Sequence, residues 1–316
     1  MYLYIVGRGH SGSTILDIVL GNSSQIESVG ELLAGLSGAD RAMCCCGEAM
    51  RNCAFWREVR SRVEAEGVTW DEACGIGERG AAALWRVWRA SRADPAMARR
   101  ARVTRALAQA ITACAGKPHV LDSSKTPAHG LLLLRYLPEA RVIHLVRDPR
   151  DCLQSYVWRI RNHKHLGMRW FRDGGRNVPL FLVYIAAGWT LVNLACDLMA
   201  RAFPGRVLRV RFEDLCAQPA SELDRIGRAF GLDLAELKSK AAGAEPLLVG
   251  HNVGGNQLRH ADVVRFDPGG GQARPPLPRW LEVVSIPLCG PLMRRYGYRL
   301  DAGASRPARS KVARSG

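Results

Sequence analysis

Short apolar runs alternate with longer segments of helical periodicity along most of the chain. The short runs are rich in Val, Ile and Leu, and they predict strands at residues 2–6, 26–29, 119–121, 142–146 and 207–210. The longer segments predict helices at residues 14–20, 127–137, 151–159, 180–202 and 220–230. Strands that are apolar throughout are typical of a parallel sheet covered on both faces by helices. We therefore predict a three-layer α/β fold with a central parallel sheet.

The segment between the second and third predicted strands is long and helical. Residues 55–115 show helical periodicity and carry four tryptophans, which predicts an inserted helical lid. Within it, residues 86–105 hold seven arginines and one acid, Asp94. This basic stretch is either a solvated helix face or a basic wall that faces an acceptor, and the pattern leaves both interpretations open.

Two segments in the last quarter of the chain differ from the rest. Residues 246–279 are rich in Gly and Pro, which predicts a long loop or flap, and such loops are often functional. Residues 302–316 hold four basic side chains and no acid, which predicts a disordered tail. The folded domain is therefore expected to span residues 1–301.

One segment is apolar enough to be considered as a membrane span. Residues 177–196 carry no charge over 20 positions. The segment contains Pro179, Gly188 and Asn193 and lies between basic stretches, so we predict a buried core helix and not an integral membrane protein. A strand begins at residue 2 with no basic region before it, so we also expect no signal peptide.

The composition is that of a folded protein with an excess of basic groups. Hydrophobic residues make up 47% and charged residues 23% of the 316 residues, which excludes a largely disordered chain. Lys and Arg number 45 against 29 acidic residues, a formal net charge of +16. This charge favours polyanionic partners, whether nucleic acid, acidic lipid, glycan or a phosphate-rich cofactor, without choosing among them.

The ten cysteines fall into two groups. Six lie singly in apolar segments, as buried thiols do, which favours the reducing cytoplasm. The other four, at positions 44, 45, 46 and 53, leave a zinc site, a disulfide and free thiols open as alternatives. Their spacing lacks a second CxxC pair and a nearby histidine, so we expect no metal.

The strongest local motif is a glycine loop between the first strand and the first helix. It reads Gly7-Arg8-Gly9-His10-Ser11-Gly12-Ser13-Thr14. The amides of such a loop, backed by a helix N-terminus, bind a phosphate oxyanion. The spacing is that of the loop in nucleoside triphosphatases, but Ser13 stands where those enzymes have lysine. We therefore expect residues 8–14 to bind a phosphate, but not a triphosphate handled with magnesium.

A second candidate phosphate site follows the fourth predicted strand. Arg147 lies at the carboxyl end of this strand, and Ser155 lies eight residues later in the next helix. An arginine and a hydroxyl in these positions can clamp a phosphate. The neighbouring Asp148 has two simpler roles, since it can pair with Arg150 or cap the helix that Pro149 begins.

Together, the two motifs resemble those of the sulfotransferases that use 3′-phosphoadenosine 5′-phosphosulfate (PAPS). Residues 8–16 resemble the 5′-phosphosulfate loop of this family, and Arg147 with Ser155 resembles its 3′-phosphate site. Further stretches resemble the bacterial branch that is similar to tyrosylprotein and carbohydrate sulfotransferases, in the same order along the chain. They lie at residues 28–32, 46–47 with 53–56, 121–125, 210–215, and 254–256 with Arg259. The resemblance implies a fold like that of the P-loop-containing nucleotide hydrolases.

The resemblance also implies roles for individual residues. Glu31 would be the general base that takes a proton from the acceptor hydroxyl, and Lys125 would neutralise charge on the sulfuryl or leaving oxygens. His10 departs from the family, which usually has Lys or Arg there to bind the bridging oxygen, so its catalytic part depends on its charge. Asn256 and Arg259 lie on the flap that the family closes over the nucleotide.

We therefore predict a cytoplasmic enzyme that moves the sulfuryl group of PAPS to an acceptor hydroxyl, or alternatively to an amine. The acceptor is expected to be a small molecule, glycan or lipid, and the basic insertion favours an anionic one. A small-molecule kinase with the same core is a competing hypothesis, against which Ser13 argues. The other is a non-catalytic binder of nucleic acid or anionic surfaces, although no aromatic stacking platform accompanies the arginines.

Overall fold

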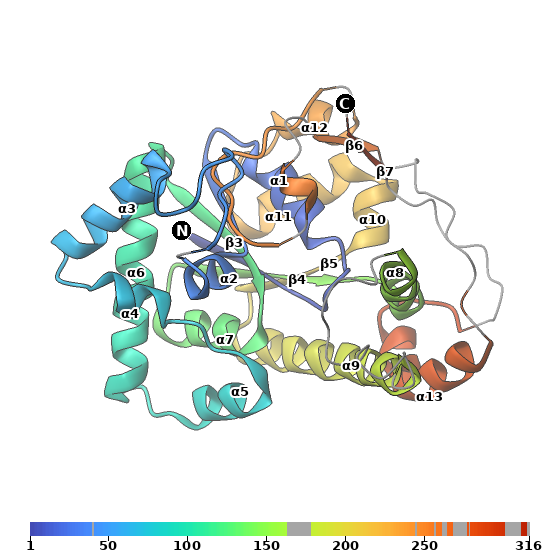
Figure 1. Cartoon of the computed structure of the whole chain (residues 1–316). Helices are drawn as coiled ribbons and strands as arrows, with labels where there is room; N and C mark the ends of the chain where they lie inside the picture. The colour runs from blue at the N-terminus through green and yellow to red at the C-terminus, as the bar shows by residue number, and fades with distance from the viewer. Residues whose placement is uncertain are drawn as a thin grey trace.

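A five-stranded parallel sheet forms the centre of the molecule (Figure 1). The computed structural model describes residues 1–39, 41–162, 178–243, 245–255, 257–260, 264–267, 277, 279–300 and 311–314. The strands are β1 (Tyr2–Val6), β2 (Ile26–Gly30), β3 (His119–Lys125), β4 (Ala140–Val146) and β5 (Val207–Arg211). Their order is β2-β3-β1-β4-β5, and every neighbouring pair is parallel. The predicted α/β fold is confirmed, and each of the five predicted strands lies within an observed one.

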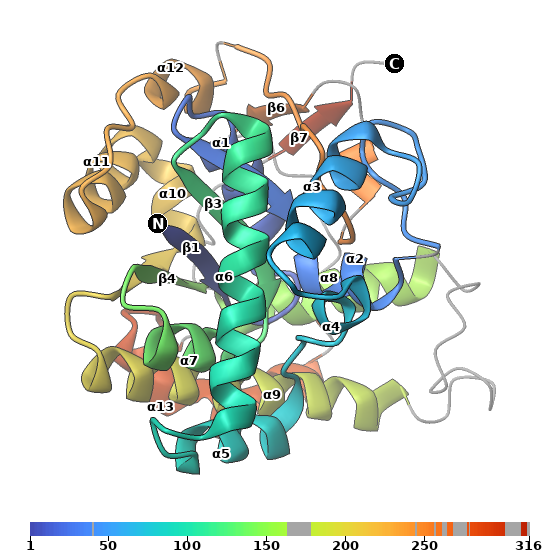
Figure 2. The same ribbon diagram turned by 90° about the vertical axis from the view of Figure 1, so that its left-hand side faces the viewer.

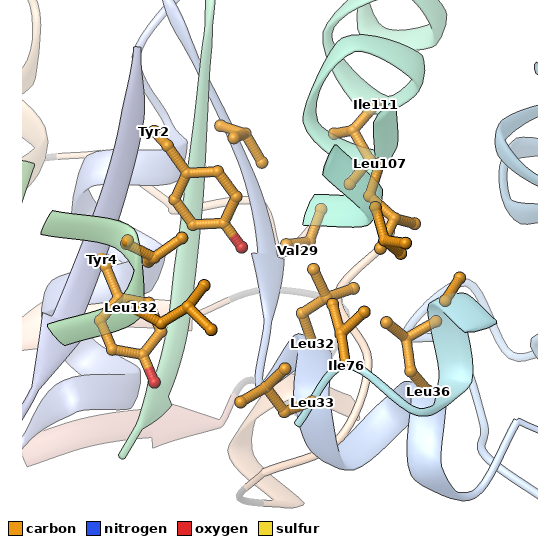
Figure 3. Close-up of a cluster of buried hydrophobic side chains, with 14 of the residues drawn as sticks. Tyr2, Tyr4, Val29, Leu32, Leu33, Leu36, Ile76, Leu107, Ile111 and Leu132 are labelled. Atoms are coloured by element: carbon orange, nitrogen blue, oxygen red, sulfur yellow. The ribbon is translucent and has the colours of Figure 1, made fainter. Parts of the chain in front are cut away.

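Helices cover both faces of the sheet because side chains alternate along each strand. Leu3 and Ile5 of β1 point to one face, whereas Tyr2, Tyr4 and Val6 point to the other. The helices packed on the first face are α1 (Ser13–Gly21), α10 (Phe212–Ala217), α11 (Pro219–Phe230) and α12 (Leu237–Ala241). Those on the second face, part of whose core is shown in Figure 3, include α2 (Leu32–Ser37), α6 (Pro95–Ala115) and α7 (Pro127–Tyr136).

The insertion between β2 and β3 is part of this second layer. It forms α3 (Ala54–Ala65), α4 (Trp70–Cys74), α5 (Gly80–Arg89) and α6, which is the long helix in the foreground of Figure 2. Leu107 and Ile111 of α6 pack into the same core as Val29 of β2 (Figure 3). The prediction of helices in this segment is confirmed. The insertion shares the core of the sheet, which favours a covering layer over a detachable lid.

Most of the arginines of the insertion are engaged within the protein. Glu78, whose side chain is only 1% exposed, pairs with Arg86 at 2.6 Å and with Arg100 at 3.1 Å. Arg105 lies 3.5 Å from Glu139, and Arg99 pairs with a carboxylate of α4. These contacts favour the interpretation of a structural, solvated helix face over that of a basic wall kept free for an acceptor.

Helix α9 (Val178–Ala202) has one buried face and one exposed face. Phe181, Trp189 and Asn193 are buried, and α9 packs against α8 (Pro149–Asn162) and α13 (Arg279–Arg295). Apolar side chains on the opposite face are exposed: Leu180, Tyr184, Leu191, Leu194 and Leu198. By length and composition α9 is the one described helix that could cross a membrane, and 39% of its most apolar window is buried. The prediction of a buried core helix is thus right for one face only.

Two segments near the C-terminus form a small second sheet. Strand β6 (Val264–Asp267) pairs antiparallel with β7 (Lys311–Arg314), and the 3₁₀ helix η2 (Gln257–His260) precedes β6. The prediction of a disordered tail over residues 302–316 is therefore wrong for residues 311–314. Pairing with a distant strand satisfies the main chain there, and composition gives no sign of it. In the predicted flap, Val253 forms bridges with Gly30 and Cys44, which ties residues 246–255 to the sheet.

Truncation of a core side chain in α6 tests whether the insertion is part of the folded core. Leu107→Ala is expected to lower the free energy of unfolding by about 2–5 kcal/mol, because it leaves a cavity at a fully buried position. Urea denaturation followed by circular dichroism measures this change. Leu191→Ala, at a side chain that is 65% exposed, is the matched control and should change stability by less than about 0.5 kcal/mol. A separate early transition of the insertion would show instead that it is a detachable lid.

Candidate active site

The carboxyl edge of the sheet collects most of the predicted site residues. Parallel strands end at a common edge, so the segments that follow β1, β2, β3 and β4 lie close together. Val6 at the end of β1 is in register with Lys125 of β3 and with His144 of β4, and the amide of Gly7 donates to the Lys125 carbonyl at 3.5 Å. The connections reverse direction at β1, which is where open α/β sheets bind ligands.

The glycine loop makes a left-handed turn into α1. Gly12 directly precedes this helix and has a φ of 95°, which glycine adopts without strain. A Cβ atom at this position would lie 2.2 Å from the ring of Phe212, so there is no space for a side chain. The loop therefore leads directly into the N-terminus of α1, whose amides and partial positive charge suit an anion.

The guanidinium of Arg147 points at the same loop. It donates to the carbonyl oxygen of His10 at 3.3 Å and lies 4.8 Å from the centre of the Phe212 ring. The indole of Trp189 donates to the backbone carbonyl of Arg147 at 2.9 Å, which fixes the chain after β4. The structure thus brings the two predicted phosphate-binding segments together.

Helix α8 packs against the glycine loop. The ring of Tyr156 meets that of His10 edge to face, with 4.2 Å between centroids, and Ser155 is buried on the same helix. Asp148 fulfils both of the simpler roles considered for it. Its carboxylate accepts from the amide of Arg150 at 2.8 Å and pairs with the guanidinium of that residue at 2.6 Å.

Three buried polar atoms on the loop and at the end of β4 have no hydrogen-bond partner among the described residues. They are Arg8 Nε, Ser11 Oγ and Arg147 Nε. Buried polar groups in folded proteins are rarely left unpaired, so these three atoms are candidates for contact with a ligand. Because two of the three atoms belong to guanidinium groups, the residues present fit an anionic ligand.

The predicted catalytic residues Glu31 and Lys125 form an ion pair. Their side chains are 17% and 20% exposed, so the pair is shielded but still reachable from solvent. Lys125 and His10 have φ values of 71° and 68°, and they are the only non-glycine residues in the described part of the chain with positive φ. Such conformations are strained, and they are retained most often at functional sites.

A buried network holds the helix that Glu31 precedes. The carboxylate of Asp122 accepts from the amide of Ser124 at 2.8 Å, from its hydroxyl at 2.5 Å and from the hydroxyl of Tyr2 at 3.1 Å. The Ser124 oxygen in turn accepts from the amide of Leu33 at 2.9 Å, in the first turn of α2. Ser124 thus caps α2 from a neighbouring strand and fixes the start of the helix beside Glu31.

The structure does not place the two predicted flap residues, Asn256 and Arg259, at the glycine loop. Asn256 lies outside the described residues. Arg259 is fully buried, pairs with the carboxylate of Asp17 at 2.8 Å and donates to the hydroxyl of Ser123 at 2.8 Å. These contacts give Arg259 a structural role that fastens the flap to α1.

One cluster was missed from the sequence. The thiols of Cys44, Cys46 and Cys53 lie together with the ring of His251, and the four potential ligand atoms are all within 4.8 Å of one another. The expectation that no histidine completes this cysteine set is wrong. His251 follows Cys53 by 198 residues, so no local spacing rule could have found it.

Comparison with known proteins identifies the family. The pattern of the group described as "Sulfotransferase family" matches residues 3–236, well over half of the chain. The chain belongs to the sulfotransferase family. No match was found among curated proteins.

Two solved sulfotransferase structures resemble this sulfotransferase in fold. The sulfotransferase domain from the curacin biosynthetic pathway is 16% identical, with a TM-score of 0.52 over 95% of this chain and 98% of that one. Sulfotransferase STF9 from Mycobacterium avium is 16% identical, with a TM-score of 0.51 over 94% of this chain and 77% of that one. Identity at this level shows the fold alone, so the roles of individual residues rest on their geometry.

The carboxyl edge of this sulfotransferase therefore combines three chemical elements. They are an anion-binding loop at a helix N-terminus, the guanidinium of Arg147 and the Glu31–Lys125 pair. Such a set can hold an anionic ester, offset charge that develops during group transfer and accept a proton.

The carboxyl group of Asp122 is expected to make the stability of the sulfotransferase depend on pH. Burial raises its pKa from 3.8 to about 7, so the folded protein keeps a proton that the unfolded chain has released. The stabilisation that this proton provides is therefore complete below pH 3.8 and is lost as the pH rises towards 7.

Asp122→Asn cannot lose this proton, so its stability should fall less than that of the wild type as the pH rises through this range. Urea denaturation at a series of pH values, with the exposed Asp71→Asn as control, measures the difference. If the difference in free energy of unfolding between wild type and Asp122→Asn does not change with pH, the raised pKa of Asp122 is contradicted.

Proposed function

We propose that this sulfotransferase moves a sulfuryl group from PAPS to a hydroxyl group of its acceptor. The observation that carries the proposal is the position of the Arg147 guanidinium, which bonds the glycine loop itself. One nucleotide with phosphates at both its 5′ and its 3′ position could then contact both segments. When bound, PAPS supplies an activated sulfuryl group and leaves as adenosine 3′,5′-bisphosphate.

The residues that would hold PAPS fall into two sets. Arg8, Gly9 and His10, the hydroxyl of Ser11 and the backbone amides of residues 12–14 would hold the 5′-phosphosulfate, and Arg147 with Ser155 would hold the 3′-phosphate. The amide of Ser11 donates to the carbonyl of Arg8 at 3.2 Å and so closes the loop. The unpaired Arg8 Nε, Ser11 Oγ and Arg147 Nε support this assignment, because each lacks a partner among the described residues. Arg259 is not included, since it is fully buried.

Glu31 and Lys125 divide the acid–base and electrostatic work. Glu31 takes the proton of the acceptor hydroxyl as the acceptor oxygen bonds to sulfur and the bond from sulfur to the nucleotide oxygen breaks. Lys125 then turns from the carboxylate towards the negative charge on the transferred and leaving oxygens. Arg8 adds positive charge at the loop, and His10 would add to it in its charged form. The left-handed backbone of His10 sets where its ring lies.

The competing functions find less support. Ser13 is the first residue of α1, in the position where a kinase of this architecture has the lysine that binds the β- and γ-phosphates. Several arginines of the insertion are paired with acids, which leaves a smaller basic surface for nucleic acid. We therefore favour a small molecule, glycan or lipid as the acceptor, with a hydroxyl preferred over an amine.

We also propose a cytoplasmic location. The ten cysteines are all free in the structure, as is usual in a reducing compartment.

Nucleotide binding tests the role of Arg147. Adenosine 3′,5′-bisphosphate is expected to raise the melting temperature of the wild type, because a ligand that binds only the folded state stabilises it. Arg147→Gln should weaken this binding by about 10- to 100-fold, the value of one charge-assisted contact to phosphate. Arg141→Gln, on the strand that Arg147 follows but outside the site, is the control and should bind as the wild type does. Stabilisation by magnesium ATP but not by the bisphosphate would point to a kinase.

Transfer of label tests the role of Glu31. Sulfur-labelled PAPS incubated with a fractionated cell extract is expected to label an acceptor, and Glu31→Gln should slow labelling by about 10²- to 10⁴-fold. The variant should bind adenosine 3′,5′-bisphosphate as tightly as the wild type, since only the base is removed. Glu27→Gln, on the strand that Glu31 follows and paired with Lys117, is the matched control and should keep its activity. Undiminished labelling by Glu31→Gln would exclude Glu31 as the base.

A further inference from the structure

The cluster of Cys44, Cys46, Cys53 and His251 lies outside the proposed sulfuryl-transfer chemistry. The loop after α2 supplies two of its cysteines, the residue before α3 supplies the third, and the flap supplies the histidine. The Sγ atoms of Cys46 and Cys53 are 3.6 Å apart. His251 Nδ1 lies 3.4 Å from Cys53 Sγ and 3.7 Å from Cys44 Sγ.

These distances are those of the edges of a metal-centred tetrahedron. Bond lengths of about 2.3 Å for Zn–S and about 2.0 Å for Zn–N, at tetrahedral angles, place two sulfurs about 3.8 Å apart and a sulfur and a nitrogen about 3.5 Å apart. The three separations above agree with these values to about 0.2 Å, and all four ligand atoms lie within 4.8 Å of one another. Three thiolates and one imidazole are the soft ligands that select zinc over magnesium or calcium.

The surroundings of the cluster orient its ligands. The backbone amides of Cys46 and Glu48 donate to the sulfur atoms of Cys44 and Cys46, in a turn that Gly47 completes with a φ of 92°. Amide donors of this kind stabilise metal-bound thiolates. The ring of His251 stacks on that of Phe55, with 4.8 Å between centroids and planes 4° apart, which fixes the direction of Nδ1.

We propose that Cys44, Cys46, Cys53 and His251 bind one structural Zn²⁺ ion. Four protein ligands leave no open coordination position, so the ion takes no part in the transfer reaction. The ion would join the loop before α3 to the flap, two segments that lie far apart in the sequence. Its binding would then contribute to the free energy of folding. Cys46 is exposed and His251 is partly buried, which gives the ion a route to the buried thiols of Cys44 and Cys53.

The zinc site would also support Glu31 through the flap. The amide of Glu31 donates to the carbonyl of Val253 at 2.9 Å, and the amide of Val253 donates to Val29 at 3.0 Å. Gly255 lies so close to the Glu31 carboxylate that a Cβ there would be 2.9 Å from Oε1. His251 is only two residues before Val253, so the metal would anchor the segment that borders the proposed base.

Metal analysis of the purified full-length protein tests the site directly. Elemental mass spectrometry should find one zinc per chain in the wild type and in Cys45→Ser. Cys45 is the matched control because it lies between two ligands in the sequence but is not a ligand itself. Cys46→Ser and His251→Ala should lose most of the zinc. Equal zinc content in all four proteins would overturn the assignment, and so would a zinc-free wild type with a disulfide between Cys46 and Cys53.

Reconstitution of the wild type keeps the test independent of whether the variants fold. Protein stripped with a chelator is expected to melt at a lower temperature and to recover on addition of Zn²⁺ but not of Mg²⁺. Refilling with Co²⁺ should give the visible bands of tetrahedral cobalt and a thiolate-to-metal charge-transfer band. Stripped protein that neither regains stability with Zn²⁺ nor shows these bands with Co²⁺ would refute the site. Both measurements are made without PAPS, so they stand or fall separately from the sulfotransfer reaction.

Discussion

The parallel pairing of β1 between β3 and β4 is the constraint on which the site depends. It brings the glycine loop, Lys125 and Arg147 to one edge of the sheet, although more than a hundred residues separate the loop from the other two in sequence. Burial of both faces of β1 keeps this arrangement in place, because Leu3 and Ile5 pack into the core on one face and Tyr2 and Tyr4 into the core on the other. A shift of register by one residue would turn every one of these side chains to the wrong face.

The chemistry at this edge is held by groups that are costly to bury. The carboxylate of Glu213 accepts from the amide of Asp148 at 2.8 Å and from the hydroxyl of Tyr298 at 2.8 Å, and burial raises its pKa. Asp122 plays the same part at the start of α2. Each buried carboxyl group orders a backbone segment that precedes a site helix, so the polar interior serves to position the site more than to stabilise the fold.

The positive charge of the chain is used largely for internal structure. Arg259 and Asp17 form a fully buried pair, and Arg209 and Arg295 both contact Asp197. The guanidinium of Arg206 donates to three backbone carbonyls, two of them in the last turn of α7 and the residue that follows it, where a helix dipole is negative. Because many of these arginines are bonded within the protein, a net charge of +16 is weak evidence for a polyanionic partner.

The sequence by itself determined the layers of the fold and the two phosphate motifs, because strand and helix periodicity and a glycine loop are local patterns. It could also suggest Glu31, Lys125 and Arg147, since each follows a predicted strand in a parallel sheet. Contacts between distant segments have no such local sign. Only the tertiary structure decided that Arg259 is buried against Asp17, that β7 pairs with β6 and that His251 joins three cysteines far from it in the chain. Residues that meet only when the chain folds leave no periodicity or spacing in the sequence.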